Sequence, residues 1–128
     1  MQLHWSSAYT GFGTTSLDTD VSELAALAAH LRNNGTKTIV VMGHSTGSQD
    51  TIHYLTTRAD ADGGIMQAPV SDREHFGTVD DAESVAWRGA LPRARELVKA
   101  GKGDTILDEP GIGIRITAYR LYSLLDIG

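Results

Sequence analysis

The chain contains no cysteine, which excludes disulfide bonds, thiolate metal sites and a cysteine nucleophile. It also has no run approaching the roughly 20 apolar residues that a membrane-spanning helix needs, and its first residues lack the basic and apolar segments of a signal peptide. A length of 128 residues is within the range of one domain with a modest core. We therefore expect one soluble, cytoplasmic domain.

Basic residues are few as well. The chain has 11 Lys and Arg against 16 Asp and Glu, which gives a net charge of −5. The two signs are interspersed, so the sequence offers no basic stretch for following a phosphate backbone or an anionic membrane. We expect neither nucleic acid nor a membrane as a partner.

The first 70 residues alternate expected strands and helices. Residues 2–7 (QLHWSS) predict a short strand, and the runs 37–42 and 63–70 are apolar without alternation, as in strands buried on both faces. A helix is expected over 46–57, and another begins at Leu17 and ends at Gly35. The βαβαβ order predicts a partial α/β fold of about three mainly parallel strands with helices on both faces. The earlier helix has apolar residues three and four apart, namely Leu17, Val21, Leu24, Ala28 and Leu31.

Residues 71–128 have a different character and predict helices without a further parallel strand. One short helix is expected around 82–86 and another from Pro92 to Gly101, because proline is favoured at the first position of a helix. A last helix is expected over 117–125, with Leu121, Leu124 and Leu125 on one face.

The pentapeptide from Gly43 to Gly47, with sequence GHSTG, matches the G-x-S-x-G nucleophile elbow of serine hydrolases. A serine at a sharp strand-to-helix turn has a strained backbone that projects its hydroxyl, and glycine at both flanks avoids collisions with the strand and helix. The start of the following helix directs free N–H groups at the site, so the N–H of Thr46 is placed to stabilise an oxyanion. Ser45 is therefore the candidate nucleophile, with His44 beside it in the elbow.

A serine hydroxyl needs a base, usually a histidine that a carboxylate orients. Of the five histidines, His75 has the most plausible approach, in the loop after the last expected strand, and Asp72 is the best-placed acid. A turn-capping role is the alternative for Asp72. The other histidines are expected to be structural: His4 in the first strand, His30 and His53 on helix faces, and His44 packing near the turn.

The clustered carboxylates do not predict a metal site. No histidine has the spacing that would complete a set of ligands, and each carboxylate fits a solvated loop or a first helical turn. We therefore expect no metal and no other cofactor. These carboxylates are Asp60, Asp62, Asp80, Asp81 and Glu83.

Four stretches, SSAYTGFGTTSLDTDVSEL, IVVMGHSTGSQDTIHYL, GGIMQAPVSDRE and ITAYRLYSLL, resemble an α/β-hydrolase family of largely unknown function. This family is best known from fungi and is also found in plants, and its members include siderophore ester hydrolases. The resemblance implies that Ser45 is the nucleophile of carboxylic ester hydrolysis and that Thr46 supplies one oxyanion donor. Members of the family are longer on both sides and carry their acid and histidine downstream. The resemblance therefore implies a single incomplete α/β-hydrolase domain, with a core over 1–70 and a cap-like segment over 71–128.

Three interpretations follow from the sequence. The chain is the central portion of a serine hydrolase that cleaves a small-molecule ester, or a shortened enzyme that recruits His75 and Asp72. Alternatively, it is a non-catalytic interaction module of the same family, which associates with itself through exposed sheet edges. Aromatic residues of the carboxyl-terminal half either line the site or belong to the core, and these are Trp87, Tyr119 and Tyr122.

Overall fold

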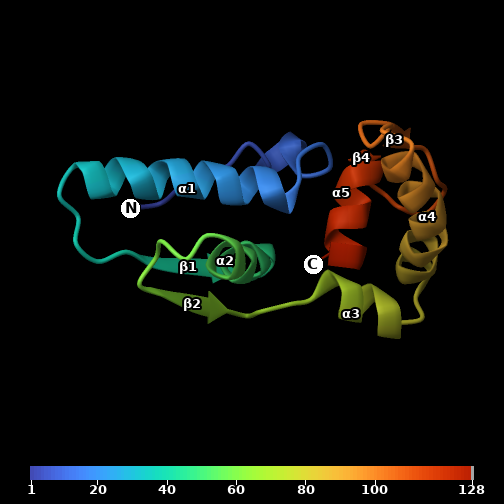
Figure 1. Cartoon of the computed structure of the whole chain (residues 1–128). Coiled ribbons are helices and arrows are strands. Elements are labelled where there is room, and N and C mark those ends of the chain that lie inside the picture. Colours follow the sequence, from blue (N-terminus) through green and yellow to red (C-terminus); the bar gives the residue numbers. More distant parts are fainter. Residues whose placement is uncertain (128) are drawn as a thin grey trace. The chain divides into compact units, whose positions relative to one another are not determined.

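The computed structural model describes residues 1–127, which divide into two compact units (Figure 1). The first unit contains Met1–Trp5 and Leu17–Val70, and the second contains Ser6–Ser16 and the chain from Ser71 onward. Among the described residues, no helix combines the length and apolar character needed to cross a membrane.

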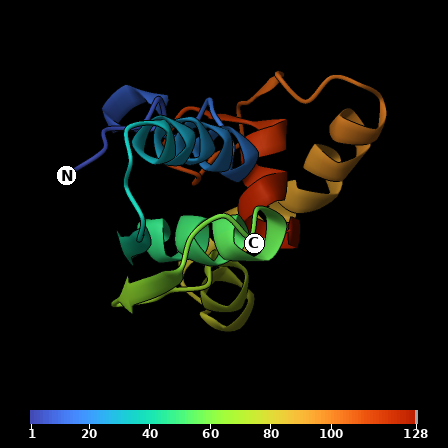
Figure 2. The ribbon, with the colours of Figure 1, turned by 60° about the vertical axis from the view of Figure 1, so that its left-hand side comes forward.

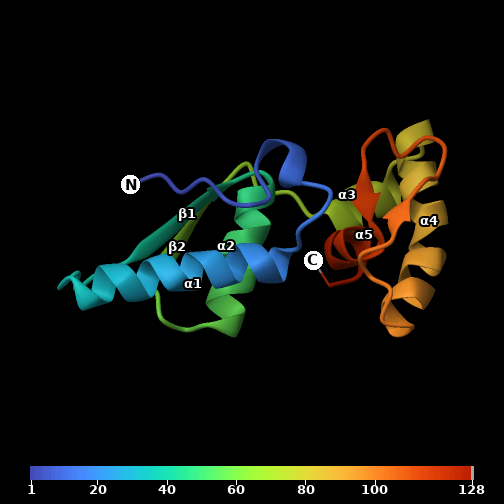
Figure 3. The same ribbon diagram turned by 90° about the horizontal axis from the view of Figure 1, so that it is seen from above.

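The first unit is built from two helices and a pair of parallel strands. Its elements are α1 (Leu17–Asn33), β1 (Val40–His44), α2 (Thr46–Thr57) and β2 (Gly63–Gln67). The two strands lie side by side in register, from Val40 opposite Gly63 to His44 opposite Gln67 (Figure 3). The expected partial α/β fold is confirmed, and α2 begins and ends at the predicted residues.

One buried cluster joins α1, β1 and α2, and α2 lies between α1 and β2 (Figure 2). The predicted spacing on α1 is confirmed, because Leu31 is partly buried and the other apolar positions are buried. At the end of α1, Gly35 has a φ of +89°, and the Thr36 N–H donates to Leu31 O at 3.0 Å. The cluster consists of Val21, Leu24, Ala28, Ile39, Val41 and Tyr54.

The two faces of the β1–β2 pair differ, contrary to the expectation of burial on both. Val41 is 9% exposed, and side chains of α2 pack closely over Gly64 on the same face. The alternate residues Val40, Met42 and Ile65 are 52%, 62% and 52% exposed. In these 127 residues α1 and α2 both contribute to the cluster on the Val41 face, which leaves the other face apolar and exposed.

The first expected strand is not formed. Within residues 2–7 the backbone joins no ladder, but Leu3 and Trp5 pack against the buried cluster. A strand needs a partner, and β1 pairs with β2. The pattern therefore identified side chains that pack in the core, but the sheet of this unit has two strands and not three.

At the amino end of the sheet, Arg32 binds to both of the loops that lead into β1 and β2. Its guanidinium donates to the carbonyls of Lys37 and Asp60 and forms an ion pair of 2.6 Å with Asp62. The Asp62 carboxylate also accepts the Ile39 N–H at 2.8 Å. We call the contacts of Arg32, Ile39 and Asp62 the amino-end clasp.

The second unit is mainly helical. A long helix, α4 (Ala82–Lys99), is one continuous element and not two helices divided at Pro92. The missing N–H of an interior proline costs about 3 kcal/mol, but the buried face of α4 at Trp87, Ala90 and Ala94 continues past Pro92. The elements are η1 (Tyr9–Gly11), α3 (Asp72–Thr78), α4 (Ala82–Lys99), β3 (Ile106–Leu107), β4 (Ile116–Thr117), α5 (Ala118–Tyr122) and η2 (Ser123–Ile127), with β3 and β4 antiparallel.

The core of the second unit contains one of the three aromatics that were candidates for lining a site. Trp87 is 3% exposed, stacks on Phe76 with ring centroids 4.4 Å apart, and donates its indole N–H to Ile112 O. Trp87 is therefore a core residue. Tyr119 and Tyr122 are half-buried on α5, where their rings are tilted against each other.

Candidate functional site

The turn between β1 and α2 is a single residue with a strained backbone. Ser45 is the one residue between the end of β1 at His44 and the start of α2 at Thr46. Its φ and ψ are 54° and −120°, a combination that residues other than glycine rarely adopt. Such strain costs about 1–3 kcal/mol and occurs most often at functional sites. Ser45 is half-buried.

The two flanking glycines have different roles. A Cβ at Gly43 would lie 1.8 Å from Gly47 O and 2.6 Å from Thr51 Oγ1, so the turn requires glycine at position 43. At Gly47 a Cβ would meet no described atom within 4 Å apart from its chain neighbours and the backbone of its own helix. The predicted collision is confirmed at Gly43 and is wrong at Gly47.

Hydrogen bonds connect this turn to the end of β2. The Ser45 N–H donates to Gln67 O at 3.1 Å, and the Ser48 N–H donates to Ser45 O at 2.9 Å. The buried Ser48 hydroxyl lies 3.0 Å from Gly43 O and 3.2 Å from Gln67 O. Ala68, which follows Gln67, also has a positive φ, of 46°. We call the group formed by Gly43, Ser45, Ser48 and Gln67 the elbow cluster.

Thr46 is the first residue of α2 and follows the candidate nucleophile directly. The first N–H groups of a helix lack partners within it, and the helix dipole places partial positive charge there. Neither acidic nor basic side chains occur in the first turn of α2. The start of this helix therefore suits stabilisation of a negative charge that develops beside Ser45.

The candidate base and acid belong to the second unit. Asp72 and His75 both lie in α3, so His75 is helical and not in a loop as expected. Ser71 caps this helix by accepting the Glu74 N–H, and the His75 ring packs edge-on against Phe76 at 5.1 Å. The roles of Asp72 and His75 stay predictions.

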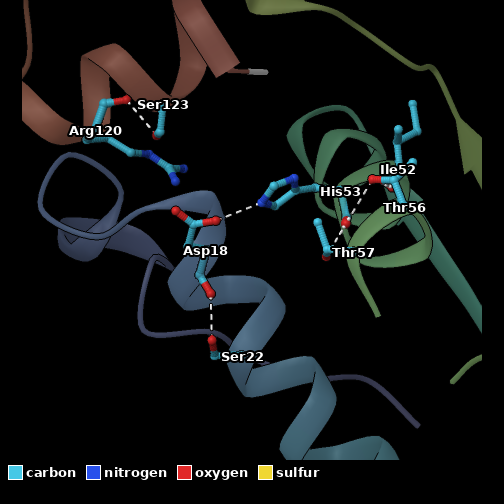
Figure 4. A network of polar contacts seen from close by, with 8 residues as sticks. All are labelled: Asp18, Ser22, Ile52, His53, Thr56, Thr57, Arg120 and Ser123. Atoms are coloured by element: carbon cyan, nitrogen blue, oxygen red, sulfur yellow. Dashed lines mark hydrogen bonds and ion pairs between the residues drawn. The ribbon is translucent and has the colours of Figure 1, made fainter. Parts of the chain in front are cut away.

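Another histidine has a carboxylate partner that sequence reasoning missed. His53 Nε2 lies 2.8 Å from Asp18 Oδ1, which joins α2 to the first turn of α1 (Figure 4). The sequence predicted His53 on a helix face, and its partner Asp18 lies 35 positions away in the chain. No local spacing could reveal this pair.

The carboxylates of the loops have structural partners. Hydrogen bonds from the Ile39 N–H and from Arg32 lower the pKa of Asp62, and the Ser84 N–H lowers the pKa of Asp81, which caps α4. Asp80 forms an ion pair of 2.8 Å with Arg88. Within residues 1–127, no three histidine or carboxylate side chains form a group that could hold a metal ion.

The buried Tyr54 has a phenol with a raised pKa. Burial is the main cause that raises the pKa of its phenol, and the nearby Asp60 raises it further. Tyr54 is 0% exposed within the cluster that joins α1, β1 and α2. Its phenol therefore stays neutral, and its role is to pack in the core.

Comparison with known proteins identifies relatives over the whole chain. A family model described as protein of unknown function (DUF1749) matches residues 1–128. A UPF0613 protein of Schizosaccharomyces pombe is 43% identical over 144 residues, which cover 99% of this chain and 44% of that protein. No solved structure matches the chain.

Two further relatives carry names that state an activity. A protein of Emericella nidulans named an esterase is 34% identical over 58% of this chain and 28% of its own length. A fusarinine C esterase of Aspergillus fumigatus is 36% identical over 56% of this chain and 28% of its own length. The chain thus spans less than half the length of each of these relatives.

Proposed function

Because the chain belongs to the DUF1749 family, a family of mostly unknown function whose fungal relatives include named esterases, we propose that it carries the nucleophile of a serine hydrolase. The proposed reaction is hydrolysis of a carboxylic ester through an acyl-enzyme on Ser45. The observation that carries the proposal is the positive φ of Ser45 at a turn where Gly43 must be glycine. The two esterase names support an ester as the substrate class.

The proposed chemistry has two steps. Ser45 Oγ attacks the ester carbonyl carbon and gives its proton to a base, while the carbonyl oxygen becomes an oxyanion to which the Thr46 N–H donates. The alcohol leaves with the returned proton, and Ser45 keeps the acyl group. Water then attacks the acyl-enzyme by the same route and releases the carboxylic acid.

The base and the acid are the open part of the proposal. His53 is paired with Asp18 and lies on α2 two helical turns beyond the elbow, which does not favour it as the base for Ser45. Within this chain His75 remains the proposed base, with Asp72 as its orienting acid. A base supplied by a family-length protein is the alternative.

Exposure to a fluorophosphonate probe, followed by intact-mass analysis, tests the proposal. We expect one adduct on the folded wild-type protein and none on Ser45→Ala. Ser22→Ala, which removes an exposed α1 hydroxyl, should label like the wild type. A folded wild type that stays unlabelled would count against an activated serine in this chain. Unchanged labelling of His75→Ala would exclude His75 as the base.

A second candidate function is supported by the exposed face of Val40, Met42 and Ile65. A two-stranded sheet has unpaired edges, and such edges pair readily with another chain. An interaction module would associate with a second copy through these edges and this face. Light scattering over a range of concentrations tests this candidate, and a monomer throughout would argue against it.

A further inference from the structure

Ser48 lies in the first turn of α2, and we propose that it is a positioning residue that holds Ser45 in its strained backbone conformation. The inference rests on the proposed role of Ser45 as the nucleophile. Ser48 is 0% exposed, so it touches neither solvent nor a substrate. It would act on the reaction only through the backbone of the elbow cluster.

The contacts of the Ser48 hydroxyl join the ends of both strands. Its Oγ lies 3.0 Å from Gly43 O, near the end of β1, and 3.2 Å from Gln67 O, at the end of β2. A hydroxyl has one proton, so the two carbonyls share a single donor. Gly43 lies two residues before Ser45 in the chain, and Gln67 O accepts a hydrogen bond from the Ser45 N–H.

Gln67 O accepts a second donor, the Ser45 N–H at 3.1 Å. The same carbonyl therefore fixes the nucleophile directly and is itself fixed by Ser48. The Ser48 N–H completes the arrangement by donating to Ser45 O at 2.9 Å. Ser45 is thus restrained at its N–H and at its C=O, and Ser48 takes part on both sides.

Other hydroxyls of α2 show how unusual this arrangement is. Thr51, Thr56 and Thr57 each donate to a carbonyl one turn back, which is the ordinary bond of a helical threonine. Ser48 reaches beyond the start of its helix to Gly43, five residues earlier, and to Gln67, 19 residues later. Its hydrogen bonds therefore connect α2 to the ends of the two strands and are not bonds within the helix.

Loss of the Ser48 hydroxyl should affect the chemical step more than binding. A reacting group that is misplaced by ~1 Å can cost about 10²-fold in rate, whereas a buried residue behind the nucleophile contributes little to substrate affinity. For Ser48→Ala we expect the limiting rate of fluorophosphonate labelling to fall at least about tenfold, with a half-saturating probe concentration within about twofold of wild type.

Two measurements on Ser48→Ala test the inference, with Thr56→Val as the control. Thr56→Val removes another hydroxyl from α2 but keeps the side-chain shape, and the lost bond to Ile52 O lies within the helix, away from the elbow cluster. The first measurement is the labelling rate as a function of probe concentration. The second is amide hydrogen exchange of Ser45 and Ser48, which reports the elbow backbone without any chemistry.

The expected result is slower labelling and at least about tenfold faster exchange of the Ser45 and Ser48 amides in Ser48→Ala, with wild-type values in Thr56→Val and at α1 amides. Exchange at the wild-type rate in Ser48→Ala would overturn the inference. If the wild type is not labelled, the proposed nucleophile fails, and exchange alone decides whether Ser48 positions the turn. Should Ser48→Ala not fold, Ser48→Cys replaces the hydroxyl by a weak donor of similar shape and gives the same comparison.

Discussion

The two ends of the β1–β2 pair are closed by different kinds of contact. At the amino end, the ion pair of the amino-end clasp joins side chains that are 34% and 45% exposed. At the carboxyl end, the elbow cluster uses uncharged groups around a fully buried Ser48. Exposed ion pairs are screened by salt and stabilise a fold weakly, whereas buried hydrogen bonds fix geometry.

This difference suggests a division of roles along one short sheet. The amino end joins loops that lie at the opposite end of the strands from Ser45. The carboxyl end must keep one serine in a conformation that its own backbone disfavours. Substitutions at the carboxyl end should therefore have larger and more local effects than substitutions at the amino end.

The largest effect is expected for Gly43→Ala at the carboxyl end. Its Cβ would lie 1.8 Å from the backbone oxygen of Gly47, so the turn has to open at a cost of about 3 kcal/mol or more. Denaturant unfolding followed by circular dichroism measures this cost. Gly47→Ala is the control, since its site is open and alanine favours a helix by up to about 1 kcal/mol. A wild-type midpoint for Gly43→Ala would refute the steric argument.

Ser48→Ala should have an intermediate effect on stability. It removes the hydroxyl shared by Gly43 O and Gln67 O, and a net hydrogen bond contributes about 1 kcal/mol. The same unfolding experiment applies, and the loss should hardly change between low and high salt because no charge is involved. A strong salt dependence would show that the carboxyl end is not held as described.

A smaller effect is expected for Asp62→Asn in the amino-end clasp. Because this substitution removes an exposed ion pair, the loss of stability should shrink at high salt. Because hydrogen bonds from Ile39 and Arg32 lower the pKa of Asp62, its contribution is full above the unfolded-state pKa of about 3.9. It is lost as the pH falls through the lower pKa of the folded state. The unfolding midpoint of Asp62→Asn should lie below that of the wild type at pH 7 and approach it in acid. A difference that grows in acid would contradict this assignment.

The smallest effect is expected between the two ends, on the exposed face. Met42→Gln replaces an apolar side chain that is 62% exposed, so stability should stay within about 0.5 kcal/mol of wild type. The variant provides a baseline for the other three. A loss of stability comparable to that of Gly43→Ala would mean that another molecule covers this face in solution. Light scattering would then show whether that molecule is a second copy of the chain.

Local patterns predicted α1, α2 and the tight turn between β1 and α2 because their signals lie within a few residues. Gly43, Ser45 and Gly47 lie within five consecutive residues, and the apolar spacing on α1 encodes its buried face directly. The prediction of a strand over 2–7 was wrong because a strand forms only beside a partner strand, and β1 pairs with β2. The prediction that a helix begins at Pro92 was wrong for a related reason. The packing of α4 outweighs the local preference of proline for the first position of a helix.

The unpredicted parts of the site depend on contacts that are distant in sequence. A serine at position 48 looks neutral on a helix, and its importance appears only when Gln67 O lies 3.2 Å away. The pairing of His53 with Asp18 likewise joins two helices. Whether His75 and Asp72 serve Ser45 stays a prediction, because Ser45 belongs to the first unit and the other two belong to the second.

The carbonyl of Gln67 has a consequence for mutational tolerance. It accepts both the Ser45 N–H and the Ser48 hydroxyl, and as a main-chain atom it is present whichever side chain occupies position 67. A scan of side-chain substitutions should therefore rank this exposed position as permissive. Replacement of the following amide by an ester, which weakens the acceptor, would instead disturb the elbow, so tolerance at position 67 does not measure its importance.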